Sequence, residues 1–299
     1  MLSVENITKS FGNARALDGV SFTIDDGAVF GLLGPNGAGK TTTMRTILSI
    51  LAPDSGHVTW NGKPIDHNAR RRFGYLPEER GLYGKMAVRE QIMFFGRLHG
   101  LRDPDVGKRA DAWIERLDIG EYAFRPAAEL SKGNQQKVQV ACAALHEPEL
   151  LILDEPFSGL DPVNADILRS ILLDLKKKGA TLVLSSFQMW QLEELCTAFC
   201  IISGGQTRVT GTLAELRAAW PTRMVRVAPD TAKLRAALEG MSATTLAGSE
   251  IGNLDINVPA ETDFAAMLRN LVAADSIVKF EVVEPSLHDI YLRAIGAAA

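Results

Sequence analysis

The sequence predicts an α/β protein of two domains, and three observations support this prediction. Short apolar runs alternate with helical patterns up to about residue 219, which is typical of a largely parallel sheet. A glycine-rich loop stands between one of these runs and a helix. After Trp220-Pro221 the order of elements changes. With 299 residues, the chain is long enough for two domains.

The first predicted domain spans residues 1–219. Its interior strands are read from fully apolar runs, because strands of a parallel sheet are buried on both faces. Three segments before the helical part read as an antiparallel β region, and residues 88–146 read as a helical insertion. The expected strands are 2–7, 20–24, 57–60, 29–33, 150–154 and 181–185, and the expected helices between them are 40–51 and 164–178.

The second predicted domain spans residues 220–299 and serves as an accessory or regulatory domain. Its segments follow the order βαββαβ, which favours a small α+β ferredoxin-like module. The expected strands are 223–227, 242–246, 255–258 and 277–283, and the expected helices are 232–239, 262–273 and 287–295.

Composition narrows the classes of function. The net charge of −4 gives no general attraction to nucleic acid or anionic lipid. No run reaches the roughly 18 to 20 apolar residues of a membrane-spanning helix, and the first residues do not resemble a signal peptide. Cys142, Cys196 and Cys200 have no zinc-like spacing, so we expect buried thiols, the last two on one helix face. We therefore expect a soluble, cytoplasmic protein.

The glycine-rich loop has the P-loop pattern GxxxxGK[ST]. Glycines let successive backbone N–H groups converge on a phosphate, and the following helix adds its positive dipole end. Lys40 is expected to reach the β- and γ-phosphates, and the Thr41 hydroxyl to bind Mg²⁺. The sequence thus predicts an ATP and Mg²⁺ site formed by Gly34, Pro35, Asn36, Gly37, Ala38, Gly39, Lys40, Thr41 and Thr42.

A second motif ends the apolar run 150–153 in two carboxylates, Asp154 and Glu155. A strand buried on both faces does not end in Asp-Glu for packing reasons. Downstream of a P-loop, the first carboxylate belongs on Mg²⁺ through water. Glu155 is then left to polarise the attacking water as general base.

Between these motifs lies Leu130-Ser131-Lys132-Gly133-Asn134-Gln135-Gln136, which resembles the LSGGQ signature of ABC ATPases. Ser131 also reads as the N-cap of the helix that follows. The resemblance covers about residues 1–216. It implies that Ser131, Gly133 and Asn134 cap the γ-phosphate of ATP bound to another subunit, that Phe11 stacks on adenine, and that Asp161 of Ser158-Gly159-Leu160-Asp161 lies along a dimer seam.

The family resemblance also implies a partner and a location. ABC ATPases of this kind work on a separate transmembrane permease subunit, from the cytoplasmic face of the membrane, and pair with a second ATPase subunit in a homodimer or heterodimer. The loop around residues 74–83 and the motif from Glu284-Pro285-Ser286-Leu287 to Tyr291-Leu292 look like those of bacterial drug, antibiotic or sodium export systems.

Two positions depart from the family pattern. Glu78 stands where most members carry a glutamine, and its carboxylate can still serve Mg²⁺. Phe187 stands where the family has its switch histidine, and phenylalanine has no hydrogen-bonding side-chain atom. The site is therefore a slow ATPase, a degenerate partner in an asymmetric dimer, or a chain in which the substitution was introduced.

Three hypotheses follow. The first is a transport ATPase in which two copies enclose two ATP molecules and drive export. The second is a degenerate ATP-binding module with negligible turnover because of Phe187. The third, an ABC ATPase acting on nucleic acid, is disfavoured because the chain has one P-loop and no long insertion for a coiled coil. A GTPase is disfavoured because no NKxD-like motif follows the P-loop.

Overall fold

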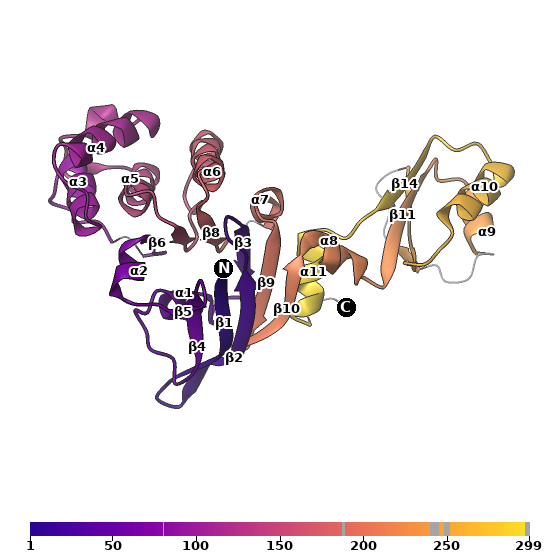
Figure 1. The fold of residues 1–299 in the computed structure, drawn as a ribbon. Coiled ribbons are helices and arrows are strands. Elements are labelled where there is room, and N and C mark those ends of the chain that lie inside the picture. The colour runs from indigo at the N-terminus through magenta and orange to yellow at the C-terminus, as the bar shows by residue number, and fades with distance from the viewer. Residues whose placement is uncertain (80, 187–188, 240–244, 248–251, 297–299) are drawn as a thin grey trace. The chain divides into compact units, whose positions relative to one another are not determined.

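The computed structural model covers all 299 residues and describes their structure except at 80, 187–188, 240–244, 248–251 and 297–299 (Figure 1). The chain divides into two compact units, Met1–Thr212 and Leu213–Ala299. Each unit has its own cluster of buried apolar side chains. Helix α8 (Leu213–Ala218) lies in the second unit, whereas the sequence alone placed the boundary after residue 219.

A six-stranded sheet forms the centre of the first unit, with the strand order β10-β9-β3-β8-β7-β6. All neighbouring strands are parallel except β10 and β9, which are antiparallel. Every residue of β3, β7 and β8 is buried, as expected for strands covered on both faces. The largely parallel sheet is therefore confirmed, with strands β3 (Val29–Leu33), β6 (Phe73–Leu76), β7 (Leu150–Leu153), β8 (Thr181–Leu184), β9 (Ala198–Ser203) and β10 (Gln206–Thr212).

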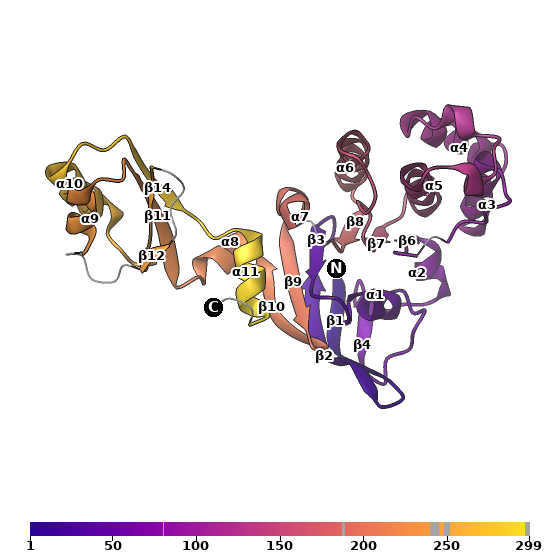
Figure 2. The same ribbon diagram turned by 180° about the vertical axis from the view of Figure 1, so that it is seen from behind.

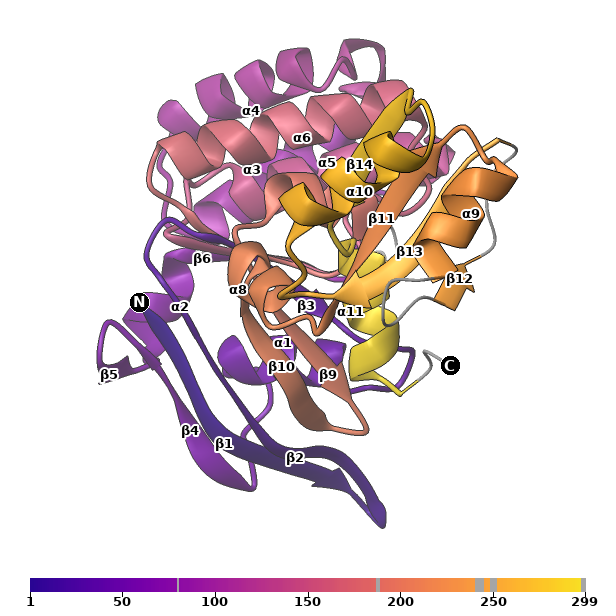
Figure 3. The ribbon, with the colours of Figure 1, turned by 90° about the vertical axis from the view of Figure 1, so that its right-hand side faces the viewer.

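The predicted antiparallel β region is also present, as a second sheet of order β2-β1-β4-β5. Strands β1 (Leu2–Phe11) and β2 (Ala14–Ile24) form a long hairpin, visible in Figure 3. β1 also pairs antiparallel with β4 (Ser55–Trp60), which pairs with the short β5 (Lys63–Pro64). The hairpin ends at Phe11, and this position matters for the site described below.

The helical insertion contains α3 (Val88–Leu98), α4 (Asp105–Arg116) and α5 (Lys132–Ala144). These helices pack on one another and are grouped together in Figures 1 and 2. Two short 3₁₀ turns, Gly120–Tyr122 and Ala127–Glu129, lie between α4 and α5. The remaining helices of the unit are α1 (Lys40–Ile47), α2 (His67–Arg71), α6 (Pro162–Lys177) and α7 (Met189–Leu195).

The second unit contains β11 (Thr222–Ala228), α9 (Ala232–Glu239), β12 (Thr245–Ala247), β13 (Leu254–Pro259), α10 (Phe264–Ala274), β14 (Lys279–Val283) and α11 (Leu287–Ala294). The predicted order βαββαβ is confirmed. The strands form an antiparallel sheet of order β12-β13-β11-β14. Helices α9 and α10 pack on one face of it through Leu234, Leu238, Met267 and Leu271 (Figure 3).

All three cysteines are buried and free, as the sequence predicted. The expectation that Cys196 and Cys200 share a helix face is wrong. Helix α7 ends at Leu195, and Cys200 lies in β9, paired with Leu32 of β3. Because its surroundings are dry, burial raises the pKa of the Cys200 thiol to about 12, so it stays protonated near neutral pH.

Candidate nucleotide site

The predicted site lies at the carboxyl ends of three adjacent strands, where ligands bind in parallel α/β sheets. β3 runs into the P-loop and then into α1, β7 runs into Asp154 and Glu155, and β8 runs into Ser185. The parallel register sets Gly31 and Leu153 level with Leu184. Segments far apart in the sequence therefore meet at one edge of the sheet.

The P-loop adopts a backbone that only glycine accepts easily. Gly37 has φ 75° and Gly39 has φ 104°, both in the left-handed region. A Cβ on Gly39 would lie 2.7 Å from the carbonyl oxygen of Ala16. Gly39 is also the N-cap of α1 and makes no side-chain capping bond, so the first N–H groups of the helix face the loop uncapped. This arrangement suits a phosphate.

Lys40 lies over the loop, where its Nζ donates hydrogen bonds to the carbonyl oxygens of Gly34 (2.7 Å) and Pro35 (3.2 Å). Burial lowers the pKa of Lys40, and the negative charges of Glu155, Asp154 and Glu78 oppose that shift. The ammonium is thus a partly desolvated cation beside three carboxylates. A polyphosphate bound here would face both the cation and the oxygen ligands of a metal ion.

A chain of hydrogen bonds connects the P-loop to the carboxylate of Asp154 and to the backbone of Glu155. The Thr41 hydroxyl donates to Asp154 Oδ2 at 2.7 Å, and the Ser185 hydroxyl donates to Asp154 Oδ1 at 2.6 Å. Ser185 Oγ also accepts a hydrogen bond from the backbone N–H of Glu155 at 3.0 Å. Ser185 is fully buried, and Asp154 is 1% exposed, so these bonds compete little with water.

The backbone of Glu155 adopts a strained conformation. Its φ is 51°, in the left-handed region that non-glycine residues rarely occupy. Such strain persists where the surroundings hold it, and it is common at functional sites. Here the backbone N–H of Glu155 donates a hydrogen bond to the hydroxyl of Ser185, and this bond helps to keep the backbone in its strained conformation.

The P-loop, Asp154 and Glu155 line one pocket of about 300 Å³. It brings together most of the residues that the sequence proposed for ATP and Mg²⁺, including Phe11 at the end of the hairpin, 49% exposed, and Glu78 just after β6. Its lining consists of Phe11, Ala16, Asn36, Gly37, Ala38, Gly39, Lys40, Thr41, Thr42, Glu78, Asp154 and Glu155.

The oxygen donors in this pocket fit Mg²⁺. The Thr41 hydroxyl and the carboxylates of Asp154 and Glu78 are hard ligands, and magnesium in proteins binds through one or two carboxylates together with substrate phosphates. Thr41 and Asp154 already touch each other through their hydroxyl and carboxylate oxygens. The residues present therefore suit a magnesium–triphosphate complex.

The signature residues do not line that pocket. Ser131 is the N-cap of α5 and accepts a hydrogen bond from the backbone N–H of Asn134, as the sequence predicted. Asp161 caps α6 in the same way by accepting from the N–H of Asn164. The two motifs are neighbours, because a Cβ on Gly133 would lie 3.6 Å from the carbonyl oxygen of Gly159.

Two residues after β8, Ser185 and Phe187, differ in how the structure bears on the sequence-based predictions. Phe187, the predicted switch position, lies outside the described residues. Ser185, to which the sequence analysis gave no role, proves to hold both Asp154 and Glu155. A hydroxyl directly after a buried strand next to the Asp-Glu strand is the signal that points to it.

A P-loop at the carboxyl end of one strand of a parallel sheet, with a buried Asp-Glu pair at the end of the next strand but one, defines a P-loop nucleoside triphosphatase. The ABC transporter family model matches residues 17–158, and the model for the C-terminal domain of DrrA1-3-like ATP-binding proteins matches residues 211–295. The chain belongs to the family of ABC transporter ATP-binding proteins, as the resemblance implied.

Individual relatives agree with this. The chain is 42% identical to the Uncharacterized ABC transporter ATP-binding protein YhaQ of Bacillus subtilis, over 99% of both chains. It is 36% identical to the linearmycin resistance ATP-binding protein LnrL of the same organism, over 72% of this chain and 70% of that one. A solved ATP-binding subunit of an ABC transporter superposes with a TM-score of 0.69 at 32% identity, covering 73% of this chain and 92% of the other.

Proposed function

We propose that this chain is the ATP-hydrolysing motor subunit of an export system, pairing with a second ATPase subunit around two ATP molecules and driving a separate membrane permease. The observation that supports it best is the single pocket that joins the P-loop, Asp154 and Glu155. A protein that only bound nucleotide would have no need for a strained glutamate next to the metal-binding aspartate.

Each residue has a defined task in this proposal. Bound Mg²⁺ neutralises charge on the phosphates. Lys40 and the P-loop N–H groups hold the β- and γ-phosphates, while Thr41 and Asp154 orient the metal. Glu155 accepts a proton from the attacking water as general base. Phe11, exposed at the rim, offers a flat apolar surface to the adenine ring.

The second subunit completes the site. The N-terminus of α5 carries Ser131, Lys132, Gly133 and Asn134, and none of these residues lines the nucleotide pocket of its own chain. Helix N-termini favour anions. In the proposed dimer, this turn caps the γ-phosphate bound to the other subunit, and Lys132, which is exposed, adds positive charge there.

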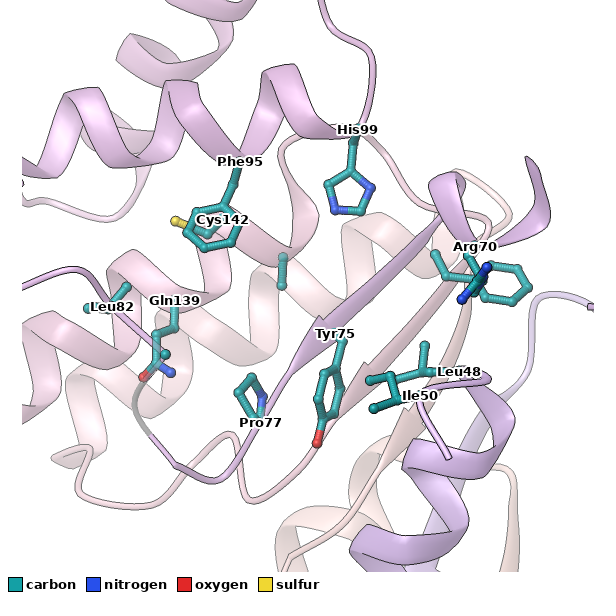
Figure 4. Close-up of a pocket in the computed structure, with 13 residues that line it drawn as sticks. Leu48, Ile50, Arg70, Tyr75, Pro77, Leu82, Phe95, His99, Gln139 and Cys142 are labelled. Atoms are coloured by element: carbon teal, nitrogen blue, oxygen red, sulfur yellow. The ribbon is translucent and has the colours of Figure 1, made fainter. Parts of the chain in front are cut away.

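An apolar pocket supports the proposed contact with the permease. It has a volume of about 400 Å³ and lies between the end of α1, strand β6, the loop after it and helices α3 and α5 (Figure 4). Figure 4 shows Ile50, Tyr75, Leu82, Phe95 and His99 around it. We propose that the permease engages the loop 78–86 and the adjoining helical region here, on the cytoplasmic face of the membrane. No helix within the described residues is long and apolar enough to cross a membrane.

The test of the motor function uses Glu155→Gln. This variant keeps the size and polarity of the side chain but removes the base, so ATP should bind and remain intact. We expect it to elute from gel filtration as a dimer with ATP and Mg²⁺, with phosphate release reduced at least about 10²-fold. Lys40→Ala is the control and should stay monomeric, because it loses the main phosphate cation. A Glu155→Gln variant that hydrolyses at the parent rate would sink the assignment.

Phe187 supports a second candidate, a degenerate ATP-binding module with negligible turnover. A single donor to the charge of a transition state contributes about 10²–10³ in rate, and phenylalanine supplies none. Single-turnover hydrolysis distinguishes the two candidates, with Phe187→His as the comparison. Turnover that appears only in the histidine variant favours the degenerate module, and equal rates favour the motor with another group in that role.

A further inference from the structure

Strand β14 forms one edge of the sheet in the second unit. Among the described residues, the only strand that pairs with it is β11, on its inner side. An open strand edge presents N–H and C=O groups to another strand, and proteins usually block such edges by bulges, proline or charge. β14 is five residues long and contains no proline.

The side chains of β14 alternate between two faces. Phe280 and Val282 lie opposite Val227 and Val225 of the buried core, on the face that α9 and α10 cover. Lys279 and Glu281 lie on the other face. Two valines at this edge are open to solvent, since Val278 is 83% exposed and Val282 is 37% exposed.

The charges on the open face form an alternating row. Arg226 of β11 makes two hydrogen bonds to Asp255 of β13, at 2.8 and 2.9 Å, and lies opposite Glu281. Glu281 bonds Lys279 at 2.7 Å, and that bond, with the charges of Lys279 and Arg226, lowers the pKa of Glu281. The open face of the edge strand thus carries a positive charge, Lys279, and a negative charge, Glu281, and an added strand with a lysine opposite Glu281 and a glutamate opposite Lys279 would complement both.

That lysine is available on a second copy of the same strand. If two β14 edges pair antiparallel with their open faces on the same side, one residue of the strand faces itself across the two-fold axis. Centring the pair on Lys279 opposes lysine to lysine, and centring it on Glu281 opposes glutamate to glutamate, which is unfavourable. Centring it on Phe280 sets Lys279 opposite Glu281 twice and Val278 opposite Val282 twice.

We propose that two copies of this chain join through β14, antiparallel and centred on Phe280. A contact between two strands of five residues each buries less surface than the roughly 1,200–2,000 Å² that a stable protein–protein interface buries. The contact therefore rests on the proposed function, because the ATP-bound dimer raises the effective concentration of one strand near the other. The contact between the two second units then forms with the ATP-bound dimer and stabilises that dimer.

Disulfide cross-linking reads the register directly. Two variants are made in the Glu155→Gln background, one with Val278→Cys and the other with Val282→Cys, and they are tested separately and as a mixture. Both variants keep Lys279 and Glu281. The native cysteines are buried and interfere little. Directly opposite Cβ atoms lie about 4.5–5.5 Å apart and can be bridged, whereas the offset between identical positions is too long. We expect a disulfide-linked dimer when the two variants are mixed with ATP and Mg²⁺. Little of this dimer should form when either variant is tested alone, or when the mixture contains no nucleotide.

Two controls sharpen the test. Val272→Cys on α10, 58% exposed, should not cross-link with either cysteine. Adding Lys279→Glu to both strands should reduce the yield at least about threefold, and Lys279→Gln should reduce it less, because only the first opposes two carboxylates. An ATP-dependent dimer in gel filtration without the mixed cross-link overturns the β14 contact and leaves the motor function standing. Absence of the ATP-dependent dimer itself contradicts the proposed function.

Discussion

Ser185 is the residue on which the geometry of the two carboxylates depends. Its single hydroxyl donates to Asp154 and accepts from the backbone of Glu155, and the second of these bonds holds a strained φ. A buried group that loses its hydrogen-bond partner costs roughly 1–3 kcal/mol. In the proposed mechanism, Ser185 therefore positions the carboxylate of Asp154 relative to Glu155, although Ser185 itself does not line the nucleotide pocket.

Ser185→Ala should lower kcat by about 10- to 100-fold, because the lost bond releases Glu155 and frees one oxygen of Asp154. ATP affinity should change by less than about twofold, since the P-loop and Lys40 are untouched, and the Mg²⁺ concentration needed for half-maximal rate should rise. Ser185→Thr keeps the hydroxyl and should restore most of the rate. Steady-state phosphate release over a Mg²⁺ titration measures all three. An equal loss of ATP affinity and kcat would point to a merely structural role.

The residues that the sequence could predict are those whose type and spacing have one chemical meaning. Gly37, Gly39, Lys40, Thr41, Asp154 and Glu155 are of this kind, and the structure brings them into one pocket. Ser185 could not be found from residue type and spacing alone, because serine after a strand is ordinary and becomes a signal only once that strand is known to lie next to the Asp-Glu strand. Its role depends on β8 lying beside β7, a pairing between segments about thirty residues apart.

At the scale of the elements, the apolar pocket beside α3 is the feature that a partner would recognise. Its lining includes Ile50, which follows α1 and is 57% exposed, and Tyr83, next to the lining residue Leu82, is 52% exposed. The ring of Tyr83 packs against Phe94 and Phe95 of α3, at 5.7 and 6.2 Å between ring centroids. The loop after β6 is thereby attached to the helical insertion, and the same loop carries Glu78 of the nucleotide pocket.

Ile50→Asp should uncouple ATP hydrolysis from the permease. A charge in this apolar lining opposes burial of an apolar partner surface, while the nucleotide pocket keeps all of its lining. We expect permease-stimulated ATPase activity to fall at least about tenfold, a loss of roughly 1.4 kcal/mol of coupling, with unstimulated activity unchanged. Val272→Asp, at 58% exposure on α10, is the matched control and should retain stimulation. Full stimulation of Ile50→Asp would place the permease elsewhere.

Elements with a strong local pattern were predictable, and those defined by distant pairing were not. The runs 29–33 and 150–153 are apolar throughout, and β3 and β7 match them. Between residues 189 and 212 the sequence predicted only a helix face shared by Cys196 and Cys200, and there the structure places α7, β9 and β10. β10 alternates between exposed and intermediate residues and has no buried face, so its place in the sheet comes from pairing with β9 rather than from its own pattern.

For the whole chain, the similarity to YhaQ extends over both units, which indicates that the second unit is an integral part of this type of subunit. The first unit holds every residue of the nucleotide pocket. The second contributes its own core and, in our proposal, the β14 contact. Global stability of the first unit also has a titratable component, which lies where α5 ends against the central sheet.

That component is His146. Its Nε2–H donates to the carbonyl oxygen of Phe73 at 3.1 Å, and its ring stacks on His99 at 3.7 Å between centroids. Burial, followed by the charges of His99 and Arg109, lowers the pKa of His146 to about 3, although the bond to Phe73 opposes the shift. The folded protein therefore keeps this ring neutral at pH values where the unfolded chain, with a pKa near 6.5, binds a proton.

This difference in pKa between the folded and unfolded states makes the free energy of unfolding fall as the pH falls. Above pH 6.5 or so, neither state protonates His146, and its contribution to stability is complete. As the pH falls from about 6.5 toward 3, only the unfolded state gains the proton, so the free energy of unfolding falls by up to about 1.4 kcal/mol per pH unit. Between pH 7.5 and 5.0, the parent should lose about 2 kcal/mol more than His146→Gln, measured by urea unfolding. The exposed His288→Gln is the control and should retain the parent's extra loss. If His146→Gln shows the same pH dependence as the parent, the buried ring is not the source of that loss.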